Sequence, residues 1–451
     1  MVRKKKLNPA AQIVIGFLSI ILIGTFLLCL PISSNNGQWF SFVDSMLTST
    51  SSVCVTGLIV VDTAVHFSLF GQIVILFLIQ IGGLGFITLT SLVFLLMGKK
   101  ITYEKRVTMK ESFNQENVQG IVKLVKNVII LVFTIEIIGF LCLAPSLVKI
   151  YGWGDGLFKA LFLAISSFCN AGFDNLGTTS TQFASLSIFS QNILILLPII
   201  FLIVIGGLGF VVLFDIGKKF KHEKLSLHSK AVLVITAILV FGGGFLFAVL
   251  EWNNPNTIGN MSFWEKIVNS FFCSITPRTA GFSTIDYTQL TPASVVLTDI
   301  FMFIGGSPAS TAGGIKTTTL LILLIAIFKS ENSNGNIPFC KRKVSTKMVK
   351  KSLRVIVFAL LLIITSTFLI CSFEGGLVTS TEAIFESISA LSTVGLTMGI
   401  TPTLCAGSKI VLMFLMFVGR VGAITLTLAL ANRKKSISYD IEYSDSKIMV
   451  G

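Results

Sequence analysis

Four short segments of the chain, each built around one glycine, contain the groups that could bind a cation through backbone oxygens. Their central glycines are Gly57, Gly172, Gly281 and Gly395. A stretch rich in Ser, Thr and Phe precedes each glycine, and a long apolar run lies on either side of each segment. Four such loops around one axis would form a ring of carbonyl oxygens, which can replace the hydration shell of a potassium ion. The pattern therefore predicts an ion pathway.

The stretches before these glycines predict short re-entrant helices, because they are too short to cross a bilayer. They cover 39–50, 157–168, 262–273 and 381–391. The C-terminal ends of such helices carry partial negative charge, which favours a cation, and glycine allows the following backbone to aim its carbonyls inward. A glycine in this place often only caps a helix, but its recurrence in all four segments favours the ion-binding interpretation.

A further segment, GGSPASTAGGIKTTT (305–319), interrupts an apolar run with residues that cannot form an ordinary continuous membrane helix. The matching places of two other runs are IGGLGFITL (81–89) and IGGLGFVVL (205–213), where small residues would let helices pack closely. We therefore predict one broken helix, whose middle (305–317) forms an intramembrane loop below the ring and acts as a gate; a passive kink is the alternative. The predicted gate residues are Gly305, Gly306, Ser310, Thr311, Gly313, Gly314, Lys316 and Arg420.

Two of these gate residues, Lys316 and Arg420, are cations within apolar runs. Ionisable groups in such positions usually face a cavity and serve function. A cation below a cation filter would repel the permeating ion and so lower occupancy or close the path. In the alternative interpretation each cation neutralises an acid or caps carbonyls, with Glu136 as the candidate partner.

Composition indicates which elements must position these groups. The chain of 451 residues is 53% hydrophobic and 12% charged, with a mean hydropathy of +0.87, whereas a soluble chain carries about 25% charged residues. We expect an all-α polytopic membrane protein with eight transmembrane helices and four re-entrant pore helices around a central pore. The predicted spans are 11–30, 70–97, 127–148, 190–214, 230–250, 294–327, 353–372 and 408–431.

The basic residues predict the topology of these spans. Of the 35 Lys and Arg, 28 lie in the N-terminus, in three connectors and in the C-terminal segment. The positive-inside rule places these segments and both termini in the cytoplasm. The net charge of +14 is therefore a topology signal and does not indicate a nucleic-acid partner. The eight cysteines have no metal-binding spacing, and we expect no covalent cofactor.

The spans and segments predict four repeated units, each made of a span, a pore loop and a second span. The units cover 8–98, 120–220, 228–330 and 350–432, and a cytoplasmic tail (433–451) follows. Internal repetition on this scale defines a fold. Because each unit contains two full spans, it is predicted to form one quarter of a pore.

The four loops, the 305–319 segment and Arg420 resemble the Trk/Ktr/HKT superfamily of potassium transporters. TPRTAGF (276–282) and STVGLTMG (392–399) are specific signatures, and the resemblance covers nearly the whole chain. The chain begins directly with its first unit, in which it is similar to the Ktr membrane subunit (KtrB/KtrD type).

The resemblance implies potassium uptake across the plasma membrane of a bacterium, stimulated in many relatives by Na⁺. It also implies a homodimer in membrane lipid and a cytosolic ring of regulatory subunits (KtrA/KtrC type), which would bind the nucleotide in place of this chain. Some relatives that conduct sodium carry serine at the first filter glycine, so Gly57 favours potassium. The implied filter residues, with K⁺ at their carbonyls, are Val55, Thr56, Gly57, Asn170, Ala171, Gly172, Thr279, Ala280, Gly281, Thr393, Val394 and Gly395.

Two other classes of protein fit the sequence less well than a channel-like pore does. An alternating-access secondary transporter, such as a Na⁺/K⁺ symporter, would have broken helices in paired positions, whereas the sequence predicts one break among four equivalent spans. A membrane enzyme would need a catalytic constellation, and His66, His222 and His228 lie at loop positions without a catalytic motif. We therefore expect a channel-like uptake protein and no enzyme.

Overall fold

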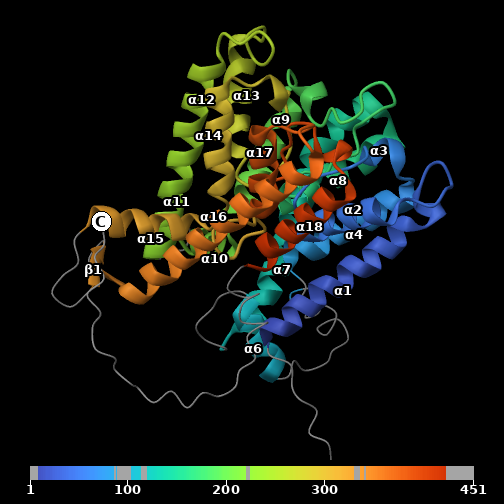
Figure 1. Cartoon of the computed structure of the whole chain (residues 1–451). Helices are drawn as coiled ribbons and strands as arrows, with labels where there is room; N and C mark the ends of the chain where they lie inside the picture. The colour runs from blue at the N-terminus through green and yellow to red at the C-terminus, as the bar shows by residue number, and fades with distance from the viewer. Residues whose placement is uncertain are drawn as a thin grey trace, which may run out of the picture.

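The computed structural model describes residues 9–85, 88, 103–112, 119–219, 224–329, 336–339 and 342–422. Helices make up most of these residues and run together in one bundle (Figure 1). Within this part of the chain, four helices are long and apolar enough to cross a membrane, or five if one bent pair counts as a single span. The expectation of a helical protein with several apolar helices is confirmed, but within the described residues the eight predicted spans are not all continuous helices.

The long helices carry an apolar face that points away from the rest of the bundle. They are α1 (Pro9–Cys29), α7 (Ile121–Tyr151), α11 (Leu227–Ala237), which continues through a π-helical turn η3 (Ile238–Gly242) into α12 (Gly243–Glu251), and α16 (Thr346–Glu374). Phe26, Leu141, Phe245 and Phe368 on these helices are all more than 60% exposed. Large apolar surfaces of this kind mark contact with a membrane or another protein, and the length and apolar composition of these helices fit a membrane.

Four shorter helices lead into the glycine segments and are buried at their C-terminal ends. They are α2 (Phe42–Cys54), α8 (Trp153–Cys169), α13 (Phe263–Ile275) and α17 (Ser380–Ser392). Capping boxes begin two of them, because Glu265 reaches back to Ser262 and Glu382 to Thr379. The buried ends are rich in Ser and Thr, so polar side chains gather around the glycine segments inside a largely apolar core.

A second set of helices follows the glycine segments. It consists of α4 (Leu69–Leu84), α9 (Ile193–Leu208), α14 (Pro292–Phe303) and α18 (Ala406–Val421). Gly85, Gly209 and Gly422 follow three of them with φ of 79°, 92° and 87°, a non-helical conformation that glycine adopts without steric cost.

The helix breaks differ from the sequence expectation in one respect. After α14 the chain leaves helical geometry and resumes as α15 (Thr317–Phe328), which agrees with the predicted break at 305–317. However, α9 also breaks, and it meets α10 (Phe210–Lys219) at an angle of 100°. The prediction of a single broken helix is therefore wrong, because the last glycine of the IGGLGF motif ends a helix as well.

The helices contact one another in a closed circular order. Each of the four short helices packs against the long helix that precedes it, as in the pairs α1 with α2 and α7 with α8. Contacts between successive units run from α4 to α8, from α9 to α13, from α14 to α17, and from α18 back to α2. The four short helices therefore surround a common centre.

The remaining elements of the described residues are short. They are η1 (Pro31–Ser33), α3 (Thr63–His66), α6 (Tyr103–Ser112), η2 (Ser187–Phe189), η4 (Tyr287–Gln289), η5 (Thr401–Thr403), β1 (Asn336–Phe339) and β2 (Arg342–Ser345). The two strands pair antiparallel, with Asn336 opposite Ser345. This hairpin departs from the all-α expectation and lies in a predicted cytoplasmic connector. The predicted tail 433–451 lies outside the described residues.

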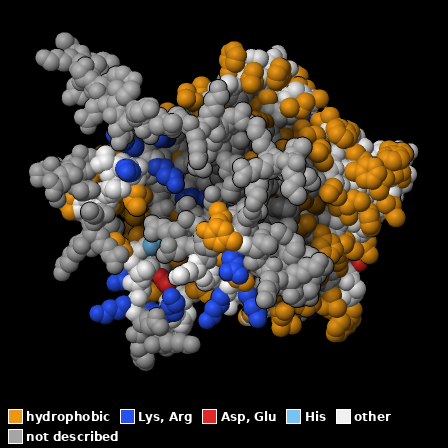
Figure 2. All heavy atoms as spheres, turned by 90° about the horizontal axis from the view of Figure 1, so that it is seen from below, with side chains coloured by type: hydrophobic (Ala, Val, Ile, Leu, Met, Phe, Trp, Pro, Cys, Tyr) orange, Lys and Arg blue, Asp and Glu red, His pale blue; other side chains and the backbone are white. Residues whose placement is uncertain are grey.

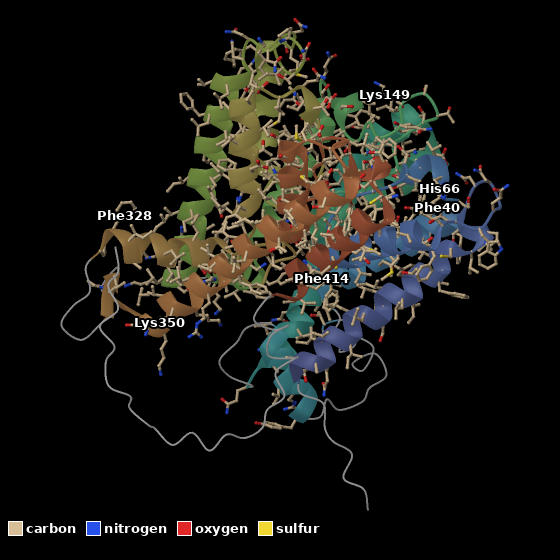
Figure 3. The ribbon with its side chains drawn as sticks, viewed as in Figure 1. Phe40, His66, Lys149, Phe328, Lys350 and Phe414 are labelled. Carbon is tan, nitrogen blue, oxygen red and sulfur yellow. The ribbon has the colours of Figure 1, made fainter. Side chains whose placement is uncertain are left out.

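Basic side chains gather at the lower end of the bundle. Figure 2 shows this end, where blue Lys and Arg side chains lie beside a flank covered by apolar side chains. In Figure 3 Lys350, near the start of α16, lies at the lower end, and Lys149, in the last turn of α7, lies at the opposite end. The positive-inside rule would place the lower end in the cytoplasm.

Candidate ion-binding site and gate

Each glycine segment begins with a residue in the left-handed backbone conformation. Val55, Asn170, Thr279 and Thr393 have φ of 57°, 57°, 77° and 51°, and each lies two residues before the central glycine. The central glycines also have positive φ, from 70° to 99°. Left-handed geometry costs a non-glycine residue about 1–2 kcal/mol, so four repetitions indicate that the surrounding structure imposes this turn.

The four central glycines lie against one another in a closed ring. A methyl group on Gly57 would lie 2.6 Å from the carbonyl oxygen of Ala171, and one on Gly172 would lie 2.9 Å from that of Ala280. Each glycine therefore sits against the carbonyl that precedes the glycine of the next unit, and no side chain fits between them. The ring is completed by Gly281 against the Val394 carbonyl and by Gly395 against the Thr56 carbonyl.

Hydroxyl groups at the ends of the short helices hold these segments in place. Ser51 Oγ accepts a hydrogen bond from Gly57 N (3.0 Å), Ser389 Oγ accepts one from Gly395 N (3.1 Å), Ser166 Oγ donates to Phe173 O (2.6 Å), and Thr276 Oγ1 donates to Phe282 O (2.6 Å). These four hydroxyl groups were not predicted from the sequence. The signal was present, however, because a Ser or Thr recurs five or six residues before every central glycine.

The loop between α14 and α15 packs against the second unit. Thr311 donates from its backbone N to Gly206 O (3.3 Å) and from Oγ1 to Phe168 O (3.1 Å) and Gly206 O (3.1 Å). Ala309 O accepts from Phe210 N (2.8 Å), the first residue after the α9 break. The loop thus supplies the hydrogen bond that the helix loses at Gly209.

The loop also meets the fourth glycine segment. A methyl group on Gly313 would overlap Thr393 Oγ1, and one on Gly314 would lie 3.1 Å from Ser392 O. The loop therefore lies directly against the start of that segment. Its own shape is kept by bonds from Thr317 N to Gly306 O (3.1 Å), from Ser310 Oγ to Ser307 O (2.7 Å), and by a bridge between Ile304 and Ile315 next to Gly305.

Arg420 ties this loop to the first unit. Its guanidinium donates to the Thr311 carbonyl and to the Gly82 carbonyl, and it lies 3.4 Å from Gly83 O. None of the ion pairs found in the described residues includes Arg420. The cation therefore caps carbonyl groups of two units and does not neutralise an acid.

Lys316 likewise bonds to carbonyls and lacks a carboxylate partner among the described ion pairs. Its Nζ donates to Ala312 O (2.7 Å) and Gly313 O (3.2 Å), within its own loop. Glu136, the candidate partner expected from the sequence, instead accepts from Gln80 Nε2 at 3.0 Å and 3.1 Å. Both cations therefore donate hydrogen bonds to backbone carbonyls, and neither forms an ion pair with an acid among the described residues.

A helical bundle with several helices long and apolar enough to cross a membrane, closed around a ring of four glycine segments, is consistent with a membrane transport protein. Residues 6–439 match the TrkH family, described as cation transport protein. The chain therefore belongs to this family.

Relatives and a solved structure agree with this assignment over nearly the full length. The chain is 39% identical to "Potassium/sodium uptake protein NtpJ" of Enterococcus hirae, covering 99% of this chain and 98% of the relative. It is 37% identical to "Ktr system potassium uptake protein B" of Bacillus subtilis, covering 99% and 97%. The fold is similar to that of the potassium transporter TrkH from Vibrio parahaemolyticus, with a TM-score of 0.71, 18% identity, and coverage of 96% of this chain and 87% of that one.

Proposed function

We propose that this chain takes up potassium across the plasma membrane through a pore at the centre of the bundle. The observation that carries the proposal is the closed ring of glycines and preceding carbonyls contributed by four segments. Such carbonyls could replace the water around a dehydrated K⁺. The names of the relatives, which describe potassium uptake, support the same substrate.

The loop 305–317 would act as the gate of this pore. It contacts the fourth segment and is held by Arg420 and by the carbonyls of Phe168 and Gly206. All these bonds go to groups at the ends of neighbouring helices, so the loop could leave as one piece if they were released together. The positive charge of Arg420 would also repel K⁺ that approached from below.

One observation supports an alternating-access transporter, and another argues against it. Both α9 and the α14–α15 helix are broken, and paired breaks are typical of secondary transporters. Those transporters close a midplane site from each side in turn, however, whereas four equivalent segments meet here in one ring. The ring therefore favours a pore with a gate.

Uptake of ⁸⁶Rb⁺ by a bacterium deficient in potassium uptake tests the proposal. Cells that produce the chain should accumulate the tracer, and K⁺ should compete for it at a lower concentration than Na⁺ does. The assay should be run with and without a candidate regulatory ring, and with a vector control. Absence of uptake in both arms, despite the chain being present in the membrane, would refute the proposed function.

We further propose that the chain acts as a homodimer and docks a cytosolic nucleotide-binding ring at its basic end. The proposal rests on the Lys and Arg density of the 341–354 connector and on the Ktr relatives, and Na⁺ would act as an activator. Anionic lipid headgroups would attract the same residues, so docking needs a direct test.

Replacing Lys341, Arg342 and Lys343 by glutamine should weaken co-purification of the chain with its regulatory ring, because this removes three positive charges from one connector. Membrane insertion should be unchanged. The matched control is Lys149→Gln at the opposite end of the bundle (Figure 3). If the triple variant co-purifies as fully as the control and still responds to nucleotide, these residues serve topology alone.

A further inference from the structure

A polar cluster behind the second glycine segment has no part in the proposed pathway or gate. Glu136 of α7 is only 4% exposed, and both its carboxylate oxygens accept from Gln80 Nε2 of α4, at 3.0 Å and 3.1 Å. Cys169, the last residue of α8, has its Sγ 3.8 Å from Gln80 Oε1 and 3.9 Å from Glu136 Oε1. Three helices therefore meet at one carboxylate.

The position of Glu136 calls for a physical explanation. Its neighbours Ile137 and Ile138 are 56% and 55% exposed, so this stretch of α7 faces lipid on one side and the cluster on the other. A carboxylate is costly to bury in a membrane unless it is hydrogen-bonded, and an apolar residue would pack there without that cost. We therefore attribute the presence of Glu136 to its contacts with Gln80 and Cys169, and not to a gain in stability.

The cluster is joined directly to the second glycine segment. Cys169 immediately precedes Asn170, the left-handed residue that starts the segment. A methyl group on Gly83 of α4 would lie 2.5 Å from Cys169 Sγ, so α4 and the end of α8 are in close contact. Because the turn is tight, with Ala171 N bonded to Ser166 O at 2.8 Å, a shift of Cys169 would move the carbonyl of Ala171.

We propose that Glu136, Gln80 and Cys169 form a positioning cluster that fixes the second quarter of the filter and so helps to set its preference for K⁺ over Na⁺. The inference rests on the proposed function. Glu136 and Gln80 act through Cys169 and do not touch the ion. The donor–acceptor pair between α7 and α4 is the part of the cluster that can be altered without changing the filter itself.

The test compares variants that remove the Gln80–Glu136 hydrogen bonds with a double variant in which donor and acceptor are exchanged. Glu136→Leu and Gln80→Met remove it, while the double variant Glu136→Gln with Gln80→Glu exchanges donor and acceptor. The control is Glu251→Gln, which alters another buried carboxylate, 1% exposed, that accepts from Thr257 (2.8 Å) and Thr291 (2.7 Å) at the end of α12. K⁺ and Na⁺ competition against ⁸⁶Rb⁺ uptake gives the selectivity ratio for each.

The two breaking variants should lower the K⁺/Na⁺ ratio roughly tenfold, which is the scale of one or two lost hydrogen bonds. The reversed pair should return towards the wild-type ratio, and the Glu251 control should keep it. If Glu136→Leu fails to reach the membrane, the selectivity ratio of Gln80→Met alone tests the inference. An unchanged ratio in Gln80→Met, or an equal fall in the control, overturns the inference. A wild-type chain without any uptake would instead refute the proposed function.

Discussion

Replacing Gly57 by serine should weaken the preference for K⁺ over Na⁺ by roughly tenfold or more, since carbonyl placement sets ion preference. The new Cβ would lie 2.6 Å from Ala171 O and 3.1 Å from Gly172 Cα. Both contacts are with backbone, so the neighbouring segment must move. The φ of 99° adds strain, because a side chain rarely adopts it. Competition of K⁺ and Na⁺ against ⁸⁶Rb⁺ uptake measures the change.

Gly37→Ser is a control that separates the effect of backbone strain from the effect of a clash with the neighbouring segment. Gly37 also has positive φ, 65°, but a side chain there would meet nothing within 4 Å. The control should therefore keep the selectivity ratio even if it lowers the amount of protein. Equal ratios for wild type, Gly57→Ser and Gly37→Ser would contradict a filter at the ring.

Deleting residues 310–314 should raise the maximal uptake velocity by roughly tenfold, if the closed state dominates at rest. The deletion removes Thr311 and its bonds to Phe168 and Gly206, together with the glycines that lie against the fourth segment. The measurement is the initial rate at saturating K⁺, normalised to protein in the membrane. A folded deletion variant that is no faster than wild type would argue against a gate.

A smaller change examines the same bonds without shortening the chain. Thr311→Val removes hydroxyl bonds of about 1 kcal/mol each and should give a rise in the same direction, as should Arg420→Ala. Thr298→Val is the matched control, since that buried hydroxyl bonds only within α14, to Ser294 O at 2.7 Å. A similar rise in the control would show that loosening the unit, and not freeing the loop, speeds uptake.

The glycine segments could be located from the sequence because their geometry is local. A left-handed turn two residues before a glycine needs a short helix, a Ser or Thr near its end and the glycine itself, and all of these recur at fixed spacing. The break within 305–317 was likewise visible, because Gly305, Pro308 and Gly313 cannot continue an apolar helix.

The break after Leu208 was missed because the repeated IGGLGF motif was interpreted as a site of close helix packing, although Gly85, Gly209 and Gly422 occupy matching places and each follows a helix end with positive φ. IGGLGF packs well as a helix, and Gly206 does lie against the Phe168 carbonyl. The helix stops at Gly209 where Ala309 O accepts from Phe210 N in place of a helical carbonyl. The carbonyl partners of Arg420 could not be predicted, because they belong to two other units and residue types do not indicate which carbonyls lie nearby.

The four segments of the ring belong to one polypeptide, so a single substitution alters only one of them. In a tetramer of identical chains every substitution appears four times, whereas here one codon alters one quarter. The quarters already differ, because Cys54, Cys169, Arg278 and Ser392 occupy the same place, three residues before their glycines. Altered quarters can therefore be introduced one, two, three or four at a time. The shape of that dose response would reveal whether the carbonyls recognise the ion independently or as a single cooperative unit.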